Sequence, residues 1–343
     1  MDCRVKRSGG LTCLSLLPVF YLLTSTPVYA ESLSKALKET EFNLTLRYRF
    51  ENVDQDGFSE DAEASTLKTR MSIQTGRFKG INGLIELDNV STLGSDDYND
   101  ASGLGNTSFP VIADPEGTDF NQLLLNFEGD SFSATVGRQR INHNDQRFLG
   151  GVAWRQNEQT YEAIRVRGDA ADSFALDVSY FQRVNRIFGP DGTKNNFNGE
   201  FFALNSIYTY DKNHQVAAFL YTLDFDDSAG SSNNTLGFTY KGNYDRYSVT
   251  TSVALQEDSG SNPSDYSAEY LLLEGAASFG GFKFGAGYEQ LGSDNGVGFQ
   301  TPLATLHKWQ GFADKFLATP ADGIADTYVK AVTTVKGVKL VAM

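Results

Sequence analysis

The chain has 343 residues, with 33 glycines, 8 prolines, 13% aromatic residues and a formal net charge of −14. A soluble protein of this length would normally form about two domains. The sequence contains no linker, low-complexity tract or change of composition that would divide it, which favours one continuous sheet over two globular units. The acidic balance argues against nucleic acid as a partner.

The first thirty residues are typical of a secretory signal peptide. Lys6 and Arg7 supply the basic end, residues 11–23 the apolar core, and Ala30 a small residue before the cleavage point. Cleavage there removes both cysteines, so the mature chain would have no disulfide and no thiolate metal site. Residues 31–40 are then expected to form a periplasmic N-terminal tail.

After this region polar and apolar residues alternate in fourteen stretches, and the connections between them are alternately long and short. The long connections cover residues 52–65, 91–118, 141–159, 185–199, 224–234, 257–264 and 291–325. The short ones include residues 77–80, 129–131, 211–213, 243–245 and 279–281. Short turns at one end and long loops at the other are typical of a chain that crosses an outer membrane repeatedly.

The first stretch shows the alternation clearly. Its apolar side chains, from Phe42 to Phe50, share one face, and its polar side chains, from Asn43 to Glu51, share the other. A soluble β-sandwich also alternates, but its strands are usually shorter and nothing in it requires alternate loop lengths. We therefore predict an all-β fold, an antiparallel transmembrane β-barrel over residues 41–343. Three stretches alternate too weakly for their faces to be assigned: those near Phe201, Val216 and Tyr270.

The last residues form an incomplete strand in this reading. A turn at Lys336-Gly337 is followed by the start of a fifteenth strand, from Val338 to Met343. Because an open sheet edge in lipid leaves backbone N–H and C=O groups unsatisfied, a barrel must close. We therefore expect the sequence to be a truncated copy that lacks about three strands.

Basic side chains fall on or beside the polar faces of the strands. They are Arg47, Arg49, Lys68, Arg70, Arg138, Arg140, Arg165 and Arg167. Guanidinium groups on a channel wall would attract carboxylates and bind them bidentately, which predicts an anion-selective lumen. Alternatively, or in addition, the arginines pair with acids of the wall and fill the barrel with salt bridges. The candidate acids are Glu51, Glu86, Asp88, Glu128, Glu162 and Asp177.

Several motifs lie around the third long connection. They read Val136-Gly137-Arg138-Gln139-Arg140-Ile141-Asn142, then Asn144-Asp145-Gln146-Arg147-Phe148-Leu149-Gly150-Gly151, then Trp154-Arg155-Gln156-Asn157-Glu158-Gln159-Thr160-Tyr161. Two further motifs are Leu46-Arg47-Tyr48-Arg49 and Thr301-Pro302-Leu303-Ala304-Thr305-Leu306-His307-Lys308-Trp309 with Gly311, Asp314 and Lys315.

Taken together, these motifs resemble the alginate-export family of outer-membrane proteins. The resemblance implies an eighteen-stranded barrel and passage of an acidic polysaccharide, alginate, along an arginine-lined pore. It also implies that Arg138, Arg140, Arg147 and Arg155 guide the polymer. Whether such a channel exports or takes up its cargo stays open.

The long connection 291–325 has two possible fates. Thr301 can cap and Pro302 can open a short helix, whose partial apolar face would hold Leu303, Leu306 and further phenylalanines, Phe312 and Phe316. Such a segment either folds into the pore as a constriction or packs outside on its neighbours.

The histidines give no sign of catalysis. None of His143, His214 and His307 has a second ligand at metal-binding spacing, and no serine partner for His143 is evident. We therefore expect no catalytic residue, no metal site and no cofactor.

The resulting hypothesis is a passive channel in the outer membrane of a Gram-negative bacterium that favours anions, above all an acidic polysaccharide or its oligomers. The rival is a structural or surface-binding barrel whose lumen the 291–325 connection plugs. Expected partners are the lipid bilayer, lipopolysaccharide, the acidic oligo- or polysaccharide and the barrel-assembly machinery. The expected pore-lining residues are Arg47, Arg49, Arg70, Arg138, Arg140, Arg147, Arg155, Arg165 and Arg167.

Overall fold

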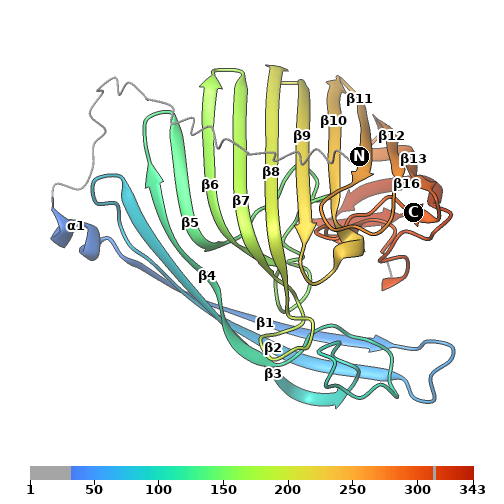
Figure 1. Ribbon diagram of the computed structural model, residues 1–343, viewed down its shortest axis with the longest axis horizontal. Coiled ribbons are helices and arrows are strands. Elements are labelled where there is room, and N and C mark those ends of the chain that lie inside the picture. The colour runs from blue at the N-terminus through green and yellow to red at the C-terminus, as the bar shows by residue number, and fades with distance from the viewer. Residues whose placement is uncertain (1–31, 312–313) are drawn as a thin grey trace, which may run out of the picture.

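The computed structural model describes residues 32–311 and 314–343, and their strands form one antiparallel sheet in chain order (Figure 1). Fifteen strands make up this sheet, and β14 (Ser293–Asp294) and β15 (Val297–Gly298) form a separate small hairpin. The strands of the main sheet are β1 (Glu41–Val53), β2 (Ala62–Gln74), β3 (Ile81–Asp97), β4 (Gly117–Glu128), β5 (Phe132–Gln139), β6 (Thr160–Ala171), β7 (Phe174–Asn185), β8 (Asn196–Asp211), β9 (His214–Phe225), β10 (Asn233–Tyr244), β11 (Tyr247–Asp258), β12 (Ser267–Phe279), β13 (Phe282–Leu291), β16 (Ile324–Val335) and β17 (Val338–Ala342).

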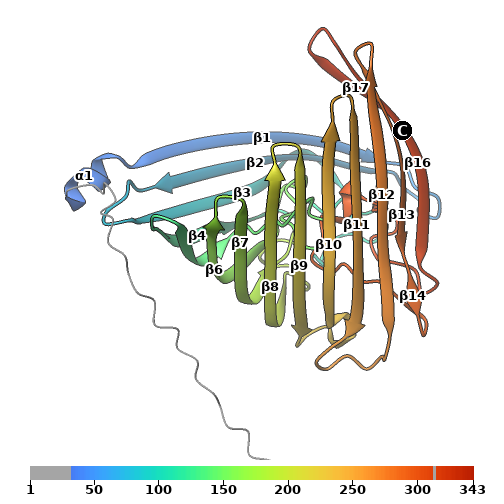
Figure 2. The ribbon, with the colours of Figure 1, turned by 90° about the horizontal axis from the view of Figure 1, so that it is seen from above.

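The alternation of long and short connections is confirmed. Each short turn joins two neighbouring strands at one end of the sheet, as the β8–β9 and β10–β11 turns do, and each long connection starts from the other end (Figure 2). The sheet curves strongly, and the connections after β5 and β13 fold onto its concave side, whereas the β1–β2 connection extends beyond the ends of its strands (Figure 1). In the described part of the chain β1 and β17 are the two edge strands, and the barrel is not closed between them.

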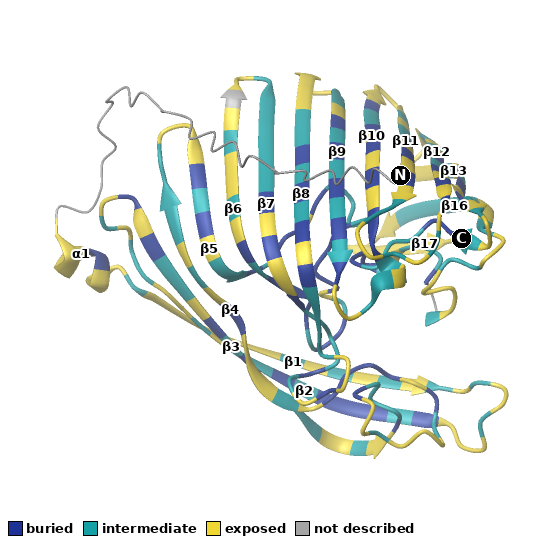
Figure 3. Ribbon diagram, viewed as in Figure 1, coloured by how far each residue is buried: buried dark blue, intermediate teal, exposed yellow. Residues whose placement is uncertain are grey.

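The convex face of the sheet carries apolar side chains, as the alternation predicted. On β1, Phe42 is 74% exposed and Phe50 is 56% exposed, and Leu44, Leu46 and Tyr48 between them are exposed as well. Exposed and buried residues follow one another along many strands (Figure 3). Apolar side chains exposed over a whole strand are costly in water and favourable in lipid.

The three stretches with weak alternation have a physical explanation. Their concave-face side chains are apolar too, because these strands pack against long connections that fold inward. Phe219 of β9 and Tyr270 of β12 both contact the ring of Phe148, which lies in the connection between β5 and β6. Phe299, from the connection after β13, is fully buried in the same cluster. With apolar residues on both faces, the period of two disappears from the sequence.

The 291–325 connection therefore lies on the concave side, and its expected helix is wrong. Leu303 forms a parallel bridge with Leu149 and accepts a hydrogen bond from the N–H of Gly150, which keeps this backbone extended. Among the described residues of the segment, Leu306–Lys308 form a 3₁₀ turn, η2. Phe312, which was expected on the helix face, lies outside the described residues.

A short helix precedes the sheet. It is α1 (Leu33–Lys38), in which Ser32 caps the N-terminus by accepting from the N–H of Lys35. Ala36 is buried, and its carbonyl accepts from the N–H of Gly76 in the turn between β2 and β3. Part of the expected tail is thus held against the short-turn end. The expected signal peptide lies outside the described residues, and no helix within them is long and apolar enough to cross a membrane.

Candidate functional site: the charged concave wall

The register of the first strands pairs charges across the sheet. Arg70 of β2 lies opposite Asp88 of β3, and its Nε and Nη2 donate to the two carboxylate oxygens over 2.7 and 2.6 Å. This bidentate geometry is the strongest that arginine offers a carboxylate. Both side chains are mostly buried, so the pair belongs to the wall itself.

A carboxylate of the connection between β5 and β6 (residues 140–159, called the inward connection below) joins this pair. Glu158 forms an ion pair with Arg70 over 2.9 Å and accepts a hydrogen bond of 3.0 Å from the side-chain amide of Asn121. It also pairs with Arg140, which in turn pairs with Glu86. Burial alone would raise the pKa of Glu158, but the positive charges of Arg140 and Arg70 lower it to about 2. The connection between β5 and β6 is therefore fixed to the wall by an ionised carboxylate.

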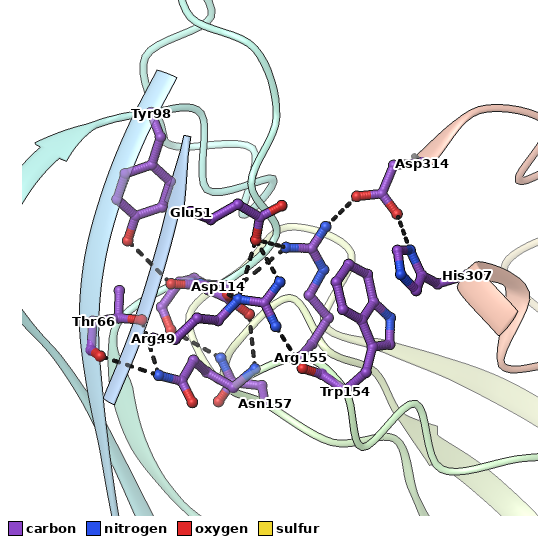
Figure 4. Close-up of polar contacts among 12 residues, drawn as sticks. Arg49, Glu51, Thr66, Tyr98, Asp114, Trp154, Arg155, Asn157, His307 and Asp314 are labelled. Carbon is purple, nitrogen blue, oxygen red and sulfur yellow. Dashed lines mark hydrogen bonds and ion pairs between the residues drawn. The ribbon is translucent and has the colours of Figure 1, made fainter. Parts of the chain in front are cut away.

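A second buried network connects several long connections (Figure 4). Arg155 is only 2% exposed and pairs with Glu51 of β1 over 3.2 Å, with Asp114 over 3.7 Å, and with Asp314. Asp114, in the connection between β3 and β4, also pairs with Arg49 over 3.0 Å. One arginine thus holds segments that follow β3, β5 and β13.

Aromatic stacking reinforces this network. Trp154 stacks on His307 with ring centroids 3.4 Å apart, and the guanidinium groups of Arg155 and Arg49 lie 4.0 and 4.6 Å from the tryptophan ring (Figure 4). Since a desolvated cation over an aromatic face gains on the order of 1–2 kcal/mol, Trp154 adds to the ion pairs around it.

Neutral contacts dock the same connection. The side-chain amide of Gln156, which is fully buried, donates over 2.9 Å to the hydroxyl of Thr66 on β2, and its backbone N–H donates over 2.7 Å to Asp114. Arg47 donates to the backbone carbonyls of residues 153–155. Within residues 32–311 and 314–343 no carboxylate forms an ion pair with Arg47, and its guanidinium group is held by these backbone carbonyls.

Arg147 anchors the connection after β13. Its Nε donates over 2.6 Å to Glu289 of β13, which also accepts from Tyr270 over 2.8 Å and from Gln310 over 2.5 Å. The side chains of Arg147 and Glu289 are almost completely buried. Arg147, expected to guide a polymer, is therefore placed here as a tether.

The remaining predicted arginines differ from one another. Arg165 pairs with Asp177 of β7, which lies two residues from its register partner Ser179. Arg138 pairs with Asp119 over 2.8 Å and with Glu162 over 2.6 Å. Arg167 is exposed, and no described carboxylate pairs with it. The predicted arginine–acid network is confirmed.

The acids of that network were predicted in part. Glu51, Glu86, Asp88, Glu162 and Asp177 pair with the predicted arginines, and Glu128 lies 3.8 Å from Arg77 instead. The sequence reading missed Asp114, Asp119, Glu158 and Glu289. Glu158 could have been found, because it lies within the Trp154–Tyr161 motif.

One further cation was missed. Arg186 lies in the connection after β7, with its guanidinium 4.5 Å from the ring of Phe188 and 4.0 Å from that of Phe197. Burial lowers its pKa to about 10, and in the described chain no carboxylate pairs with it. Its signal in the sequence was an arginine between aromatic residues in a long connection.

His143 is buried beside the charged wall. Its Nδ1 lies 3.3 Å from the Tyr221 hydroxyl and its Nε2 lies 3.4 Å from Asp177 Oδ2. These contacts give it a place in the packing of the inward connection.

Comparison with known proteins agrees with this architecture. The structure is similar to OccAB2 of Acinetobacter baumannii (TM-score 0.67, 15% identity, 88% of this chain and 78% of that one) and to OccAB4 of the same organism (0.63, 16%, 87% and 79%). It is also similar to Pseudomonas aeruginosa OpdK, solved with vanillate (0.62, 13%, 87% and 78%). At these identities the likeness establishes the fold alone, an antiparallel β-barrel. A search of curated protein sequences finds no match.

The family follows from the sequence motifs and a profile match together. The model of the alginate export family matches residues 38–302, which include the charged wall and the inward connection that carries Arg147, Arg155 and Glu158. The chain belongs to the alginate export family.

Proposed function

We propose that this protein is an outer-membrane channel for anionic solutes, with an acidic polysaccharide such as alginate, or its oligomers, as cargo. The observation that carries the proposal is the set of arginines that form no ion pair with a described carboxylate: Arg47 on β1, Arg167 on β6 and Arg186 in the connection after β7. Most other arginines of the wall are paired with acids. At the three unpaired arginines a solute carboxylate could form an ion pair without displacing an acid of the wall.

Passage would be passive. A guanidinium replaces water around a carboxylate through charge-assisted hydrogen bonds, and conduction requires each contact to be weak enough to let the solute move on. Arg140 supports this role because it is about a quarter exposed while it pairs with Glu86 and Glu158. Its exposed side can meet a solute, and its paired side stays fixed.

The partners follow from the location. We place the convex apolar face in the lipid bilayer, the long connections beside lipopolysaccharide and the short turns in the periplasm, after insertion by the barrel-assembly machinery of a Gram-negative cell. The export signal is the proposed peptide at residues 1–30.

The test is the reversal potential of the refolded protein in a planar bilayer under a salt gradient, before and after addition of oligomannuronate. We expect anion preference and block by the oligomer. Cation preference would contradict the proposal.

A second candidate is a structural or surface-binding barrel with a plugged lumen. The concave position of the 291–325 connection, with Phe299 and Leu303 fully buried, favours it. Replacing residues 306–318 with a short glycine–serine link separates the two candidates. A plugged barrel would show no conductance before the replacement and would conduct after it, whereas a channel would already conduct before the replacement.

A further inference from the structure

An apolar hollow lies on the convex face of the sheet, next to the short turn between β2 and β3. Its volume is about 310 Å³, within the range of roughly 300–1,000 Å³ that small-molecule sites have. The large side chains around it are exposed on the face that we place in lipid: Ile73, Ile85, Leu123, Leu125 and Val136. The hollow therefore opens toward lipid acyl chains and away from the charged concave wall.

A glycine leaves this space open. Gly83 of β3 lies opposite Leu125 of β4 and has no side chain to fill the space between its neighbours. A Cβ on Gly83 would lie 3.5 Å from the Cδ2 of Leu125 and 3.8 Å from the carbonyl oxygen of Leu124, which are ordinary contact distances. The fold would thus accept a larger residue at position 83, and the space is accessible to an occupant from the lipid.

A hydroxyl group lies at the edge of the hollow. It belongs to Thr75, the polar side chain among the residues that line the space, and its Oγ1 accepts from the N–H of Gly83 over 2.9 Å. A hydroxyl has one O–H donor besides its acceptor lone pairs. That donor can serve a ligand, and the ester carbonyl of a glycerolipid is an acceptor that lies between an acyl chain and a headgroup.

A lysine lies at the rim beyond this hydroxyl. Lys79 is exposed at the tip of the β2–β3 turn, roughly 10 Å from Thr75 at a rise of about 3.3 Å per residue. Its Nζ lies 5.4 Å from the centroid of the Phe78 ring, and Phe78 forms a bridge with Ile81, which is exposed on the convex face. The ammonium group therefore lies on the lipid-facing side of the turn, where lysine side chains reach from apolar surface to phospholipid headgroups.

We propose that this hollow binds one anionic phospholipid of the periplasmic leaflet, with an acyl chain against Gly83, an ester carbonyl on Thr75 and the phosphate on Lys79. The proposal rests on the proposed placement of the convex face in lipid and of the short turns in the periplasm, and it is independent of the cargo. An apolar hollow alone would not select one lipid, because bulk acyl chains are equally apolar. The order of hollow, hydroxyl and ammonium matches a phospholipid from its acyl chain to its phosphate.

Native mass spectrometry of the refolded full chain in detergent tests the site with two probes, dioleoylphosphatidylglycerol and dioleoylphosphatidylethanolamine. Wild type should bind one phosphatidylglycerol about fivefold more tightly than phosphatidylethanolamine, the factor that one basic residue contributes at an anionic lipid surface. The ammonium group of phosphatidylethanolamine would be repelled by Lys79. Lys79→Gln should remove the fivefold preference, and Gly83→Leu, which fills the hollow, should weaken binding of both lipids at least tenfold.

Two matched controls make the same changes elsewhere. Gly275→Leu adds a leucine to β12 on the lipid-facing side, opposite Val249, where a Cβ would meet nothing within 4 Å. Lys212→Gln removes an exposed lysine from the short turn between β8 and β9. Both should bind lipid as wild type does. Equal lipid affinities in Gly83→Leu and Gly275→Leu, or an unchanged preference for phosphatidylglycerol in Lys79→Gln, would overturn the proposal. Lys79→Gln changes only an exposed turn, so it tests the site even if Gly83→Leu does not refold.

Reversal potentials in a planar bilayer separate this result from the function itself. Gly83→Leu should keep the wild-type reversal potential, because the hollow faces lipid and not the lumen. Anion preference in wild type together with unchanged lipid binding in Gly83→Leu would reject the lipid site and leave the channel. A cation-preferring wild type whose phosphatidylglycerol binding depends on Gly83 and Lys79 would reject the proposed anion channel and leave the lipid site.

Discussion

The buried arginine at residue 155 should decide whether the long connections stay on the wall. We choose Arg155→Met, which keeps an unbranched apolar side chain in place of the aliphatic part of arginine and removes the charged guanidinium group. Glu51 and Asp314 then lose this partner, and Asp114, whose side chain is 1% exposed, keeps Arg49 as its cation and the backbone N–H of Gln156 as a donor. Breaking a buried ion pair by removing one partner costs about 3–5 kcal/mol.

This loss lowers the free energy that holds the long connections against the wall. It leaves the sheet itself intact, because the hydrogen bonds between strands do not involve Arg155. A loss of about 3 kcal/mol raises the population of detached connections by more than a hundredfold, because each 1.4 kcal/mol is a factor of ten. We expect faster trypsin cleavage after Lys308 and Lys315 and noisier open-channel current. The folded barrel should still resist unfolding by sodium dodecyl sulfate.

Fluorescence gives a second reading of the same event. Both tryptophans of the chain, Trp154 and Trp309, lie in inward connections, so their emission should shift to the red in Arg155→Met. Arg246→Met is the control, because its ion pair is exposed and such pairs contribute about 0–1 kcal/mol. Cleavage and emission equal to wild type in Arg155→Met would show that the network does not hold the connections.

Three further outcomes are expected from other parts of the molecule. The pKa of Glu158 is lowered from 4.5 to about 2, so its ionised carboxylate stabilises the docked connection at pH values above 4.5, by at most about 3 kcal/mol. This stabilisation is lost as the pH falls from 4.5 toward 2, and tryptophan emission during an acid titration measures the loss. Leu46→Arg on the lipid-facing side of β1 should lower the free energy of unfolding by about 2–4 kcal/mol in urea titrations in lipid vesicles, while Thr45→Arg on the opposite face should cost much less. Gly137→Ala should reduce the refolding yield, because its Cβ would lie 2.3 Å from the carbonyl oxygen of Leu123 at a φ of +114°; a wild-type yield would show that the backbone there can move.

The strands were predictable from sequence because the signal for them is local. Side chains alternate between the two faces with a period of two, and turn residues mark the strand ends. Both patterns are visible within about ten residues. The arginines and most of the acids that pair were predicted as two sets, but not which arginine meets which acid. Arg70 pairs with Asp88 directly opposite it, whereas Arg165 pairs with Asp177 although the register places Ser179 opposite Arg165.

The contacts of the long connections were not predictable in the same way. Asp114 meets Arg155 only because two connections far apart in sequence fold to the same place on the wall. The prediction of a helix after Thr301 was wrong for a related reason. A local capping signal was outweighed by the bridge between Leu303 and Leu149, and tertiary contacts routinely override such weak local preferences.

Whether net charge or a particular arginine controls selectivity can be settled at residue 140. Arg140→Gln removes one positive charge and leaves Glu158 and Glu86 with Arg70 as their shared cation. We therefore expect the reversal potential to move toward cation preference, most at low salt because screening is weakest there. The double variant Arg140→Gln/Glu158→Gln restores the charge of the wall. If the net charge governs permeation, its reversal potential should return to that of wild type. A double variant as cation-preferring as the single one would mean that the guanidinium of Arg140 itself contacts the permeating anion.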